Sequence, residues 1–154
     1  MAGLIERHHF LFFQLSFICL WLVVSTILDL QAGWYRLMEQ YPDQAEEPIL
    51  RLRWQSGTMG RGVNMRGILT LSVCASGLRV GMWRVFGPFC RSFLVPWESI
   101  RVVRKTGLFG WAVRLEFGNP PIGRLSIAAG TADRLARAAT GRWPEATPLP
   151  ERKQ

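Results

Sequence analysis

Hydrophobic and polar positions follow three different patterns along the chain. Residues 10–28 form an uncharged apolar run, residues 34–41 carry apolar side chains at helical spacing, and most of residues 49–127 alternate with a period of two. These patterns are typical of a membrane-type helix, an amphipathic helix and half-buried β-strands, respectively. We therefore expect an apolar N-terminal helix, a short connector helix and a mainly β domain.

The run from Phe10 to Leu28 is long enough to cross a bilayer. As an α-helix, its 19 residues would extend about 28 Å, close to the ~30 Å thickness of the hydrocarbon core. Thirteen of these residues are Leu, Ile, Phe or Val, which together contribute roughly −4 to −8 kcal/mol to membrane insertion. The chain is thus predicted to have an N-terminal flank at 1–9 and a transmembrane helix at 10–28.

A cleaved signal peptide is the main alternative for this segment. It would need a basic start, a shorter apolar core and small residues before the cut. Here Arg7 stands beside Glu6, and Leu30 is a poor third residue before a cut that would follow Ala32. The sequence therefore favours an uncleaved anchor.

The connector at 29–47 contains a short amphipathic helix. Its apolar residues stand at i, i+3, i+4 and i+7: Trp34, Leu37, Met38 and Tyr41. Pro42 ends the pattern. With Trp34 and Tyr35 just outside the span, this helix could anchor at the bilayer interface. Alternatively, its apolar face packs on the following domain, and the sequence leaves both interpretations open.

The pattern from 48 to 140 predicts a β domain. Strands are expected near 49–55, 69–73, 78–82, 93–103, 111–117 and 122–127, and a short helix is expected at 131–139. An antiparallel sheet of this size curls into a barrel or a pair of packed sheets, with the helix closing one open end. The proline-rich tail at 141–154 is expected to be disordered.

Several segments of the domain resemble a known family. GILTLSVCASGLRVG, FLVPWESIRVV, GLFGWAVRLEF and ADRLARAA, between residues 33 and 139, are similar to bacterial PH-like or GRAM-like domains, several of which are attached to membrane helices. The shared features are a strand that contains Leu-Thr, a turn that contains Gly-Leu, the motif VPW-x-x-I between two strands, and a closing helix. The resemblance implies a PH-like antiparallel barrel or sandwich in a membrane setting, without catalytic residues.

Arginine dominates an uneven charge distribution. The chain has a net charge of +8, with 17 Arg and 2 Lys. Residues 29–47 carry a net charge of −4, and residues 48–142 carry +12. Such a basic domain attracts polyanions, or it is a solvated face near an anionic membrane. Because Arg7 alone precedes the span, whereas Arg36 and then Arg51 and Arg53 follow it, the positive-inside rule favours a cytoplasmic β domain.

The residues needed for catalysis are missing from the basic domain. The two histidines, His8 and His9, precede the span, and the acids of the domain are dispersed at Glu98, Glu116 and Asp133. No Cys/His cluster has the spacing of a metal site, and no glycine loop ends as a phosphate loop does. We therefore expect no enzyme activity, no cofactor and no metal.

One cluster of residues suggests a contact surface. Three bases precede an apolar loop tip: Arg101, Arg104 and Lys105, then Leu108 and Phe109. Bases beside an exposed apolar tip suit an anionic bilayer or a partner surface, and each base near such a bilayer adds about 1 kcal/mol. Alternatively, the apolar pair covers the end of the barrel and the bases form a solvated strand face.

These features predict a non-catalytic module at the bacterial inner membrane. We expect a single-pass protein whose β domain is an adaptor for protein interaction or assembly. The alternative is a domain that senses anionic lipid headgroups. Nucleic acid is disfavoured because stacking aromatics are not interleaved with the arginines, and Trp83 beside Arg84 is a lone candidate. The expected partners are the bilayer and either a protein or anionic headgroups.

Overall fold

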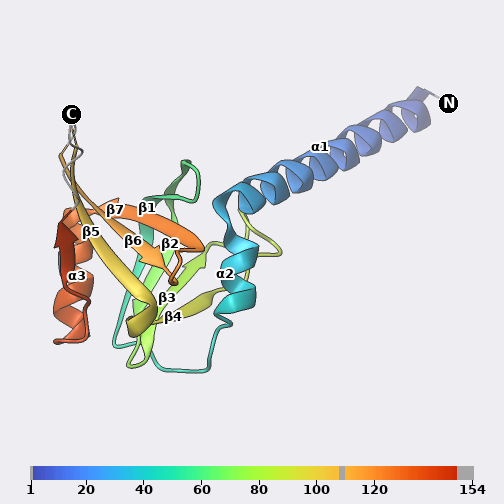
Figure 1. The fold of residues 1–154 in the computed structure, drawn as a ribbon. Coiled ribbons are helices and arrows are strands. Elements are labelled where there is room, and N and C mark those ends of the chain that lie inside the picture. Colours follow the sequence, from blue (N-terminus) through green and yellow to red (C-terminus); the bar gives the residue numbers. More distant parts are fainter. Residues whose placement is uncertain (1, 108–109, 149–154) are drawn as a thin grey trace.

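A long apolar helix, a curled β-sheet and two shorter helices make up the fold in this computed structural model, which describes residues 2–107 and 110–148 (Figure 1). The helices are α1 (Ala2–Ala32), α2 (Trp34–Gln40) and α3 (Ala129–Ala139). The strands are β1 (Leu50–Met59), β2 (Val63–Val73), β3 (Gly77–Met82), β4 (Phe93–Pro96), β5 (Ile100–Gly107), β6 (Gly110–Phe117), β7 (Gly123–Ala128) and β8 (Ala146–Pro148). A 3-10 turn, Trp97–Ser99, joins β4 to β5.

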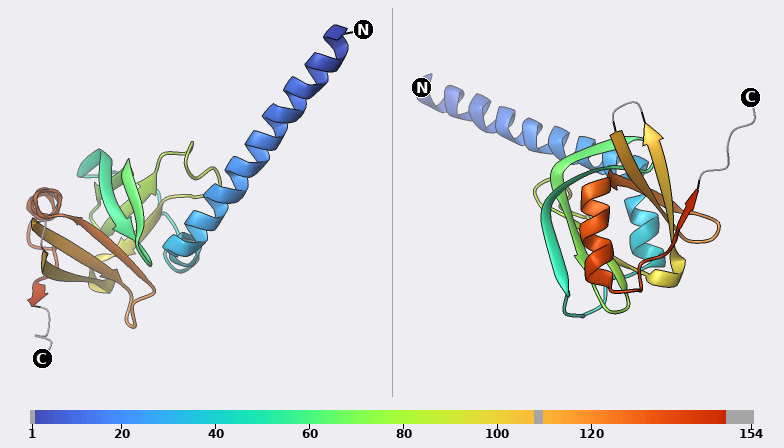
Figure 2. Two further views of the ribbon diagram at one scale, coloured as in Figure 1. Left: turned by 90° about the horizontal axis from the view of Figure 1, so that it is seen from above. Right: turned by 90° about the vertical axis from the view of Figure 1, so that its left-hand side faces the viewer.

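The strands form one sheet in the order β4-β3-β2-β1-β7-β6-β5-β8. Neighbouring strands are antiparallel except for β5 and β8, which run parallel, so the sheet is mixed. The sheet curls into a half-barrel, with α2 on one open side and α3 on the other (Figure 2). The predicted apolar helix, mainly β domain and closing C-terminal helix are confirmed at this level of detail.

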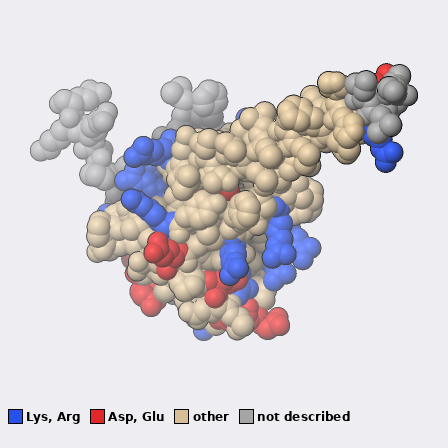
Figure 3. Space-filling model, turned by 90° about the vertical axis from the view of Figure 1, so that its right-hand side faces the viewer, with Lys and Arg blue, Asp and Glu red and all other residues tan. Residues whose placement is uncertain are grey.

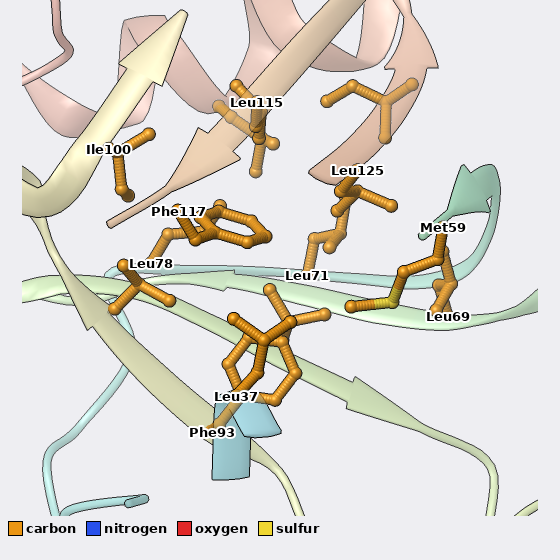
Figure 4. Close-up of a cluster of buried hydrophobic side chains, with 14 of the residues drawn as sticks. Leu37, Met59, Leu69, Leu71, Leu78, Phe93, Ile100, Leu115, Phe117 and Leu125 are labelled. Carbon is orange, nitrogen blue, oxygen red and sulfur yellow. The ribbon is translucent and has the colours of Figure 1, made fainter. Parts of the chain in front are cut away.

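The core follows the predicted alternation. On β6, Val113, Leu115 and Phe117 point inward, and on β7 Leu125 and Ile127 do the same. The amphipathic α3 adds three buried residues: Ala132, Leu135 and Ala139. Figure 4 shows the apolar cluster that these strands form with β1, β2 and β3. Burial of this cluster is the main force that holds the curled sheet together.

Helix α1 extends away from the domain and exposes most of its apolar side chains (Figure 1). Its stretch Glu6–Ala32 is long and apolar enough to cross a membrane. Two charged positions, Arg7 and Asp29, bracket the uncharged part and lie roughly 33 Å apart along the helix axis. That spacing is close to the ~30 Å of a hydrocarbon core.

Helix α2 is part of the domain core. Trp34 and Leu37 are fully buried, and the Trp34 ring lies edge-on to Phe93 with 5.0 Å between centroids. The Trp34 Nε1–H donates a hydrogen bond to the Arg91 carbonyl oxygen, at 2.9 Å. Of the two interpretations of the connector, packing on the domain is therefore the one observed. The interfacial anchor predicted at Trp34 is wrong, because this ring is enclosed by protein; Tyr35 is half-buried.

The junction between α1 and α2 is short and closely packed. Gly33 alone separates the two helices, with φ = 74°. Gly60, in the turn after β1, lies against the end of α1: a Cβ there would be 2.6 Å from the Gln31 carbonyl oxygen. On the other side, the Cys90 thiol lies near the Asp29 carboxyl group. Burial and this carboxyl group raise the pKa of Cys90, so its thiol keeps its proton.

The rest of the connector is fixed to β3 and to the turn before it. Arg79 Nε lies 2.7 Å from Asp43 Oδ1, and its Nη2 donates to the carbonyl oxygens of Gln44 and Glu46 at 2.5 and 3.0 Å. The Glu46 carboxylate accepts hydrogen bonds from the hydroxyl and the backbone N–H of Ser76, which hold its pKa below the usual value. The domain is therefore joined to α1 by ordered chain.

The tail differs from its predicted disorder. β8 pairs in parallel with β5, placing Ala146 beside Val102. Trp143 packs on Trp97 with 6.0 Å between ring centroids, and Arg142 donates to the Ala75 carbonyl oxygen at 3.1 Å. The prediction is wrong for 141–148 because one tryptophan and one strand edge fix a segment of otherwise unstructured composition. Residues 149–154 lie outside the described part.

Candidate functional site

A groove of about 450 Å³ lies on the outer face of β1, β2 and β3, opposite the core. We call it the arginine groove. Its principal lining residues are Arg51, Arg53, Trp54, Thr70, Ser72, Arg79, Gly81, Trp83 and Arg84. Most of the strand residues come from alternate positions, because the residues between them, such as Leu52 and Leu71, point into the core. Trp54 directly follows Arg53, and Trp83 and Arg84 lie in the loop after β3.

Strand register places the polar side chains of the groove in one row. Arg51 of β1 is opposite Ser72 of β2, and Ser72 is opposite Arg79 of β3. The next row along β2 pairs Thr70 with Gly81, which has no side chain. A Cβ at Gly81 would lie 2.7 Å from Ser92 Oγ, so a larger residue there would displace the Ser92 hydroxyl. The result is a floor of hydroxyl groups flanked by guanidinium groups.

Aromatic rings form one wall of the groove. The register of β1 is irregular after Leu52, and Trp54 adopts a left-handed backbone conformation with φ = 59°. Its ring meets Trp83 at a centroid distance of 5.2 Å, and Trp83 meets Phe86 at 5.7 Å. A positive φ is unfavourable for a bulky residue, and such strain is concentrated at functional sites. Here it accompanies a tryptophan that is 63% exposed.

The groove is strongly positive. Four arginines and one aspartate line it, and that aspartate, Asp43, pairs with Arg79 at 2.7 Å. Among the described residues, Arg51, Arg53 and Arg84 have no carboxylate within ion-pair distance. Guanidinium groups bind phosphate and carboxylate groups through paired hydrogen bonds. The lining therefore suits an anionic ligand that also offers an apolar surface to the tryptophans.

The groove shares its wall with the segment that lies beside α1. Trp83 and Phe86 belong to the loop between β3 and β4, which runs next to the C-terminal end of α1 in two views (Figures 1 and 2). More arginines surround this end of the helix: Arg36, Arg61 and Arg124 on one side, and Arg91 on the other. Figure 3 shows basic side chains on both sides of the base of the apolar helix. Positive charge therefore surrounds the point where α1 joins the domain.

The contact surface predicted on β5 is only partly described. Arg101 and Arg104 are exposed; Arg104 lies 3.6 Å from Asp133 of α3, and Arg101 is opposite Glu116 of β6. This setting agrees with a solvated strand face. Lys105 lies in β5, but its side chain is outside the described part, as are Leu108 and Phe109. The contact of this tip with a bilayer or a partner stays a prediction.

The arginine groove was not predicted from the sequence, although part of its signal is visible there. Arg51 and Arg53 share one parity on β1, Thr70 and Ser72 share one on β2, and Arg79 has the matching position on β3. Assembling them requires the register between strands. Trp54 could not be assigned to the wall, because a regular strand would turn its side chain inward with Leu52.

In the described part of the chain, no three His, Cys, Asp or Glu side chains are grouped so that they could hold a metal ion. Cys74 and Cys90 are buried, free thiols, and burial raises the pKa of both. Comparison with protein-family models, curated proteins and solved structures gives no match to this chain.

Proposed function

We propose that this protein is a single-pass membrane module whose arginine groove binds an anionic lipid headgroup. The observation that carries this proposal is the composition of the groove and its connection to α1: arginines without acidic partners lie together with exposed tryptophans, and one of these, Trp83, belongs to the loop that runs beside the end of an apolar helix long enough to cross a bilayer. A headgroup at this level would offer a phosphate to the arginines and its glycerol region to the tryptophan wall.

Energetics support binding at this position. Each base near an anionic bilayer surface contributes about 1 kcal/mol, and the guanidinium fork adds directional hydrogen bonds to phosphate. Tryptophan favours the headgroup level of a membrane because its ring is apolar and its N–H is polar. Arg51, Arg53 and Trp54 combine both preferences within one short segment of β1.

The basic surroundings of the helix base favour a cytoplasmic β domain. Arg36, Arg61, Arg91 and Arg124 are exposed around the end of α1. Basic residues are retained on the cytoplasmic side during insertion and are attracted to its anionic leaflet. We place the protein in the bacterial inner membrane with this orientation.

We further propose that the domain is PH-like and non-catalytic. An eight-stranded curled sheet closed by a C-terminal helix supports the first part. A groove lined by arginine, hydroxyl and aromatic side chains, without a histidine, supports the second. The sequence alone favours an adaptor for a protein partner over a headgroup sensor. The same groove would also suit an acidic segment of such a partner. The headgroup is favoured because the groove shares Trp83 and Arg84 with the loop that runs beside α1.

Charge reversal in the groove tests the proposal. In the full-length protein in neutral detergent, Arg51→Glu with Arg53→Glu should lower the affinity for phosphatidylglycerol in mixed micelles by at least tenfold, because two favourable charges become repulsive. The measurement is a titration of tryptophan fluorescence with phosphatidylglycerol, compared with phosphatidylcholine.

A matched control makes the same change in net charge on α3. Arg134→Glu with Arg137→Glu alters exposed residues on the side of the domain away from α1 and should change the affinity by less than about threefold (Figure 1). Equal losses in both variants would show that only net charge matters, and the headgroup site would be rejected. If the groove variant keeps its lipid affinity but loses a co-purifying protein, the adaptor is the correct function.

A further inference from the structure

We propose that the β3–β4 loop, residues 83–92, inserts its apolar tip into the leaflet beside α1 and is a second membrane contact. This inference rests on the membrane location of α1, which is part of the proposed function, but it is independent of what the arginine groove binds.

Exposed apolar side chains are concentrated in this loop. Outside α1, six large hydrophobic residues of the described part are exposed: Ile49, Trp54, Trp83, Val85, Phe86 and Phe89. Four of them lie in the loop, and a fifth, Trp54, contacts Trp83. A grouped apolar surface of this kind on a domain marks a contact with a membrane or a partner. The bilayer is the occupant that the next observations select.

The loop lies at the level of the predicted span. Residues 6–30 of α1 are exposed except along one face: Ser25 and Asp29 are buried, and Trp21, Leu22 and Thr26 are half-buried. This covered face extends about 12 Å from Asp29 into the apolar run. The loop follows the same end of α1 in two views (Figures 1 and 2), and the Cys90 thiol lies near the Asp29 carboxyl group.

That depth matches interfacial insertion. Apolar faces of membrane-surface segments are buried roughly 5–10 Å into the boundary between headgroups and acyl chains. If residues 10–28 occupy the hydrocarbon, a loop that follows the last turns of this helix must also enter the boundary region. Phe89 is 60% exposed in the protein and would then contact lipid instead of water.

Charge and local structure fit the same position. Arg84 and Arg91 are exposed near the two ends of the loop, where their long side chains can reach headgroups above an inserted tip. Two turns hold the loop in shape, since Phe86 N–H donates to the Trp83 carbonyl oxygen and Cys90 N–H donates to that of Gly87, both at 3.0 Å. Insertion therefore requires no refolding of the loop.

Site-specific fluorescence quenching tests the insertion. The full chain, with Cys19→Ser, is reconstituted in vesicles of phosphatidylcholine and phosphatidylglycerol and labelled with an environment-sensitive maleimide at Phe89→Cys. Cys74 and Cys90 react slowly because they are buried and protonated. We expect spin-labelled lipid to quench this probe at least threefold more than a probe at Glu98→Cys, with the opposite order for aqueous iodide.

A third probe separates the possible failures. Phe17→Cys lies in the middle of the apolar run and should be quenched by spin-labelled lipid. If Phe17→Cys is quenched by lipid while Phe89→Cys behaves like Glu98→Cys, the loop inference is wrong and the anchored module stands. If Phe17→Cys is quenched only by iodide, both the membrane anchor and the loop inference are wrong. Val85→Cys repeats the measurement at a second exposed position of the loop.

Discussion

A fragment that covers residues 48–148 is expected to lose its fold, whereas a fragment that covers 29–148 should keep it. The two differ in the connector, which carries α2. Without Trp34 and Leu37, the face of Phe93 that packs on Trp34 and the backbone at Gly123 that packs on Leu37 would be exposed to water. Loss of a buried tryptophan and a buried leucine destabilises a protein by roughly 5–10 kcal/mol together, and the total stability of a domain is about 5–15 kcal/mol.

Near-ultraviolet circular dichroism and urea unfolding of the two fragments measure this effect. The longer fragment should show a cooperative transition, and the shorter one should show none. Within 29–148, Leu37→Ala should lower the free energy of unfolding by about 2–5 kcal/mol. The matched control Arg36→Ala, at an exposed neighbour, should change it by less than about 0.5 kcal/mol. A cooperative transition of equal midpoint in both fragments would show that α2 is dispensable.

Gly123→Ala is expected to destabilise the domain by roughly 1–3 kcal/mol through overpacking. A Cβ at this position would lie 2.6 Å from Leu37 Cδ1 and 2.9 Å from Leu37 Cγ. Leu37 is fully buried, and protein interiors are close-packed, so a displacement of Leu37 disturbs its neighbours. The measurement is the urea midpoint of 29–148, with the slope of the transition unchanged.

Gly130→Ala is the matched control. Gly130 lies in α3 and has no atom within 4 Å of the position its Cβ would take. Alanine favours the helix, so this change should be neutral or stabilise by about 0.4–1 kcal/mol. If Gly123→Ala behaves like Gly130→Ala, the close packing of α2 on β7 does not exist in solution.

Packing of α2 in the core has a consequence for the anchor. Gly33 alone separates α2 from α1, and Gly60 and Cys90 lie close to the end of α1, so α1 leaves the domain without a linker. If α1 spans a bilayer as proposed, the arginine groove and the β3–β4 loop have defined positions relative to that bilayer. A flexible tether would give neither surface a preferred position.

The sequence was sufficient to predict the elements that have one periodicity and one environment. The uncharged run of α1, the alternation of β6 and β7 and the amphipathic pattern of α3 each determine their own structure. The side on which α2 packs could not be predicted, because an apolar face beside a membrane helix has two possible partners, lipid and protein. Trp34 made both plausible, and its burial against Phe93 decides between them.

The groove depends on long-range geometry that local patterns do not contain. Arg51, Ser72 and Arg79 meet only because three strands pair in a particular register. Trp54 joins the wall only because its backbone leaves the regular strand conformation. β8 was missed for a related reason, since a three-residue strand has too few positions to show alternation.

Extraction of membranes with alkaline carbonate is the most direct test of whether α1 stays in the bilayer and holds the domain there. The protein carries a tag at its C-terminus and is followed by immunoblotting of pellet and supernatant. Nineteen uncharged residues embedded in hydrocarbon predict that the protein stays in the pellet at its full length. Release into the supernatant, whether intact or shortened by loss of the N-terminal segment, would contradict the anchored domain and every membrane contact inferred from it.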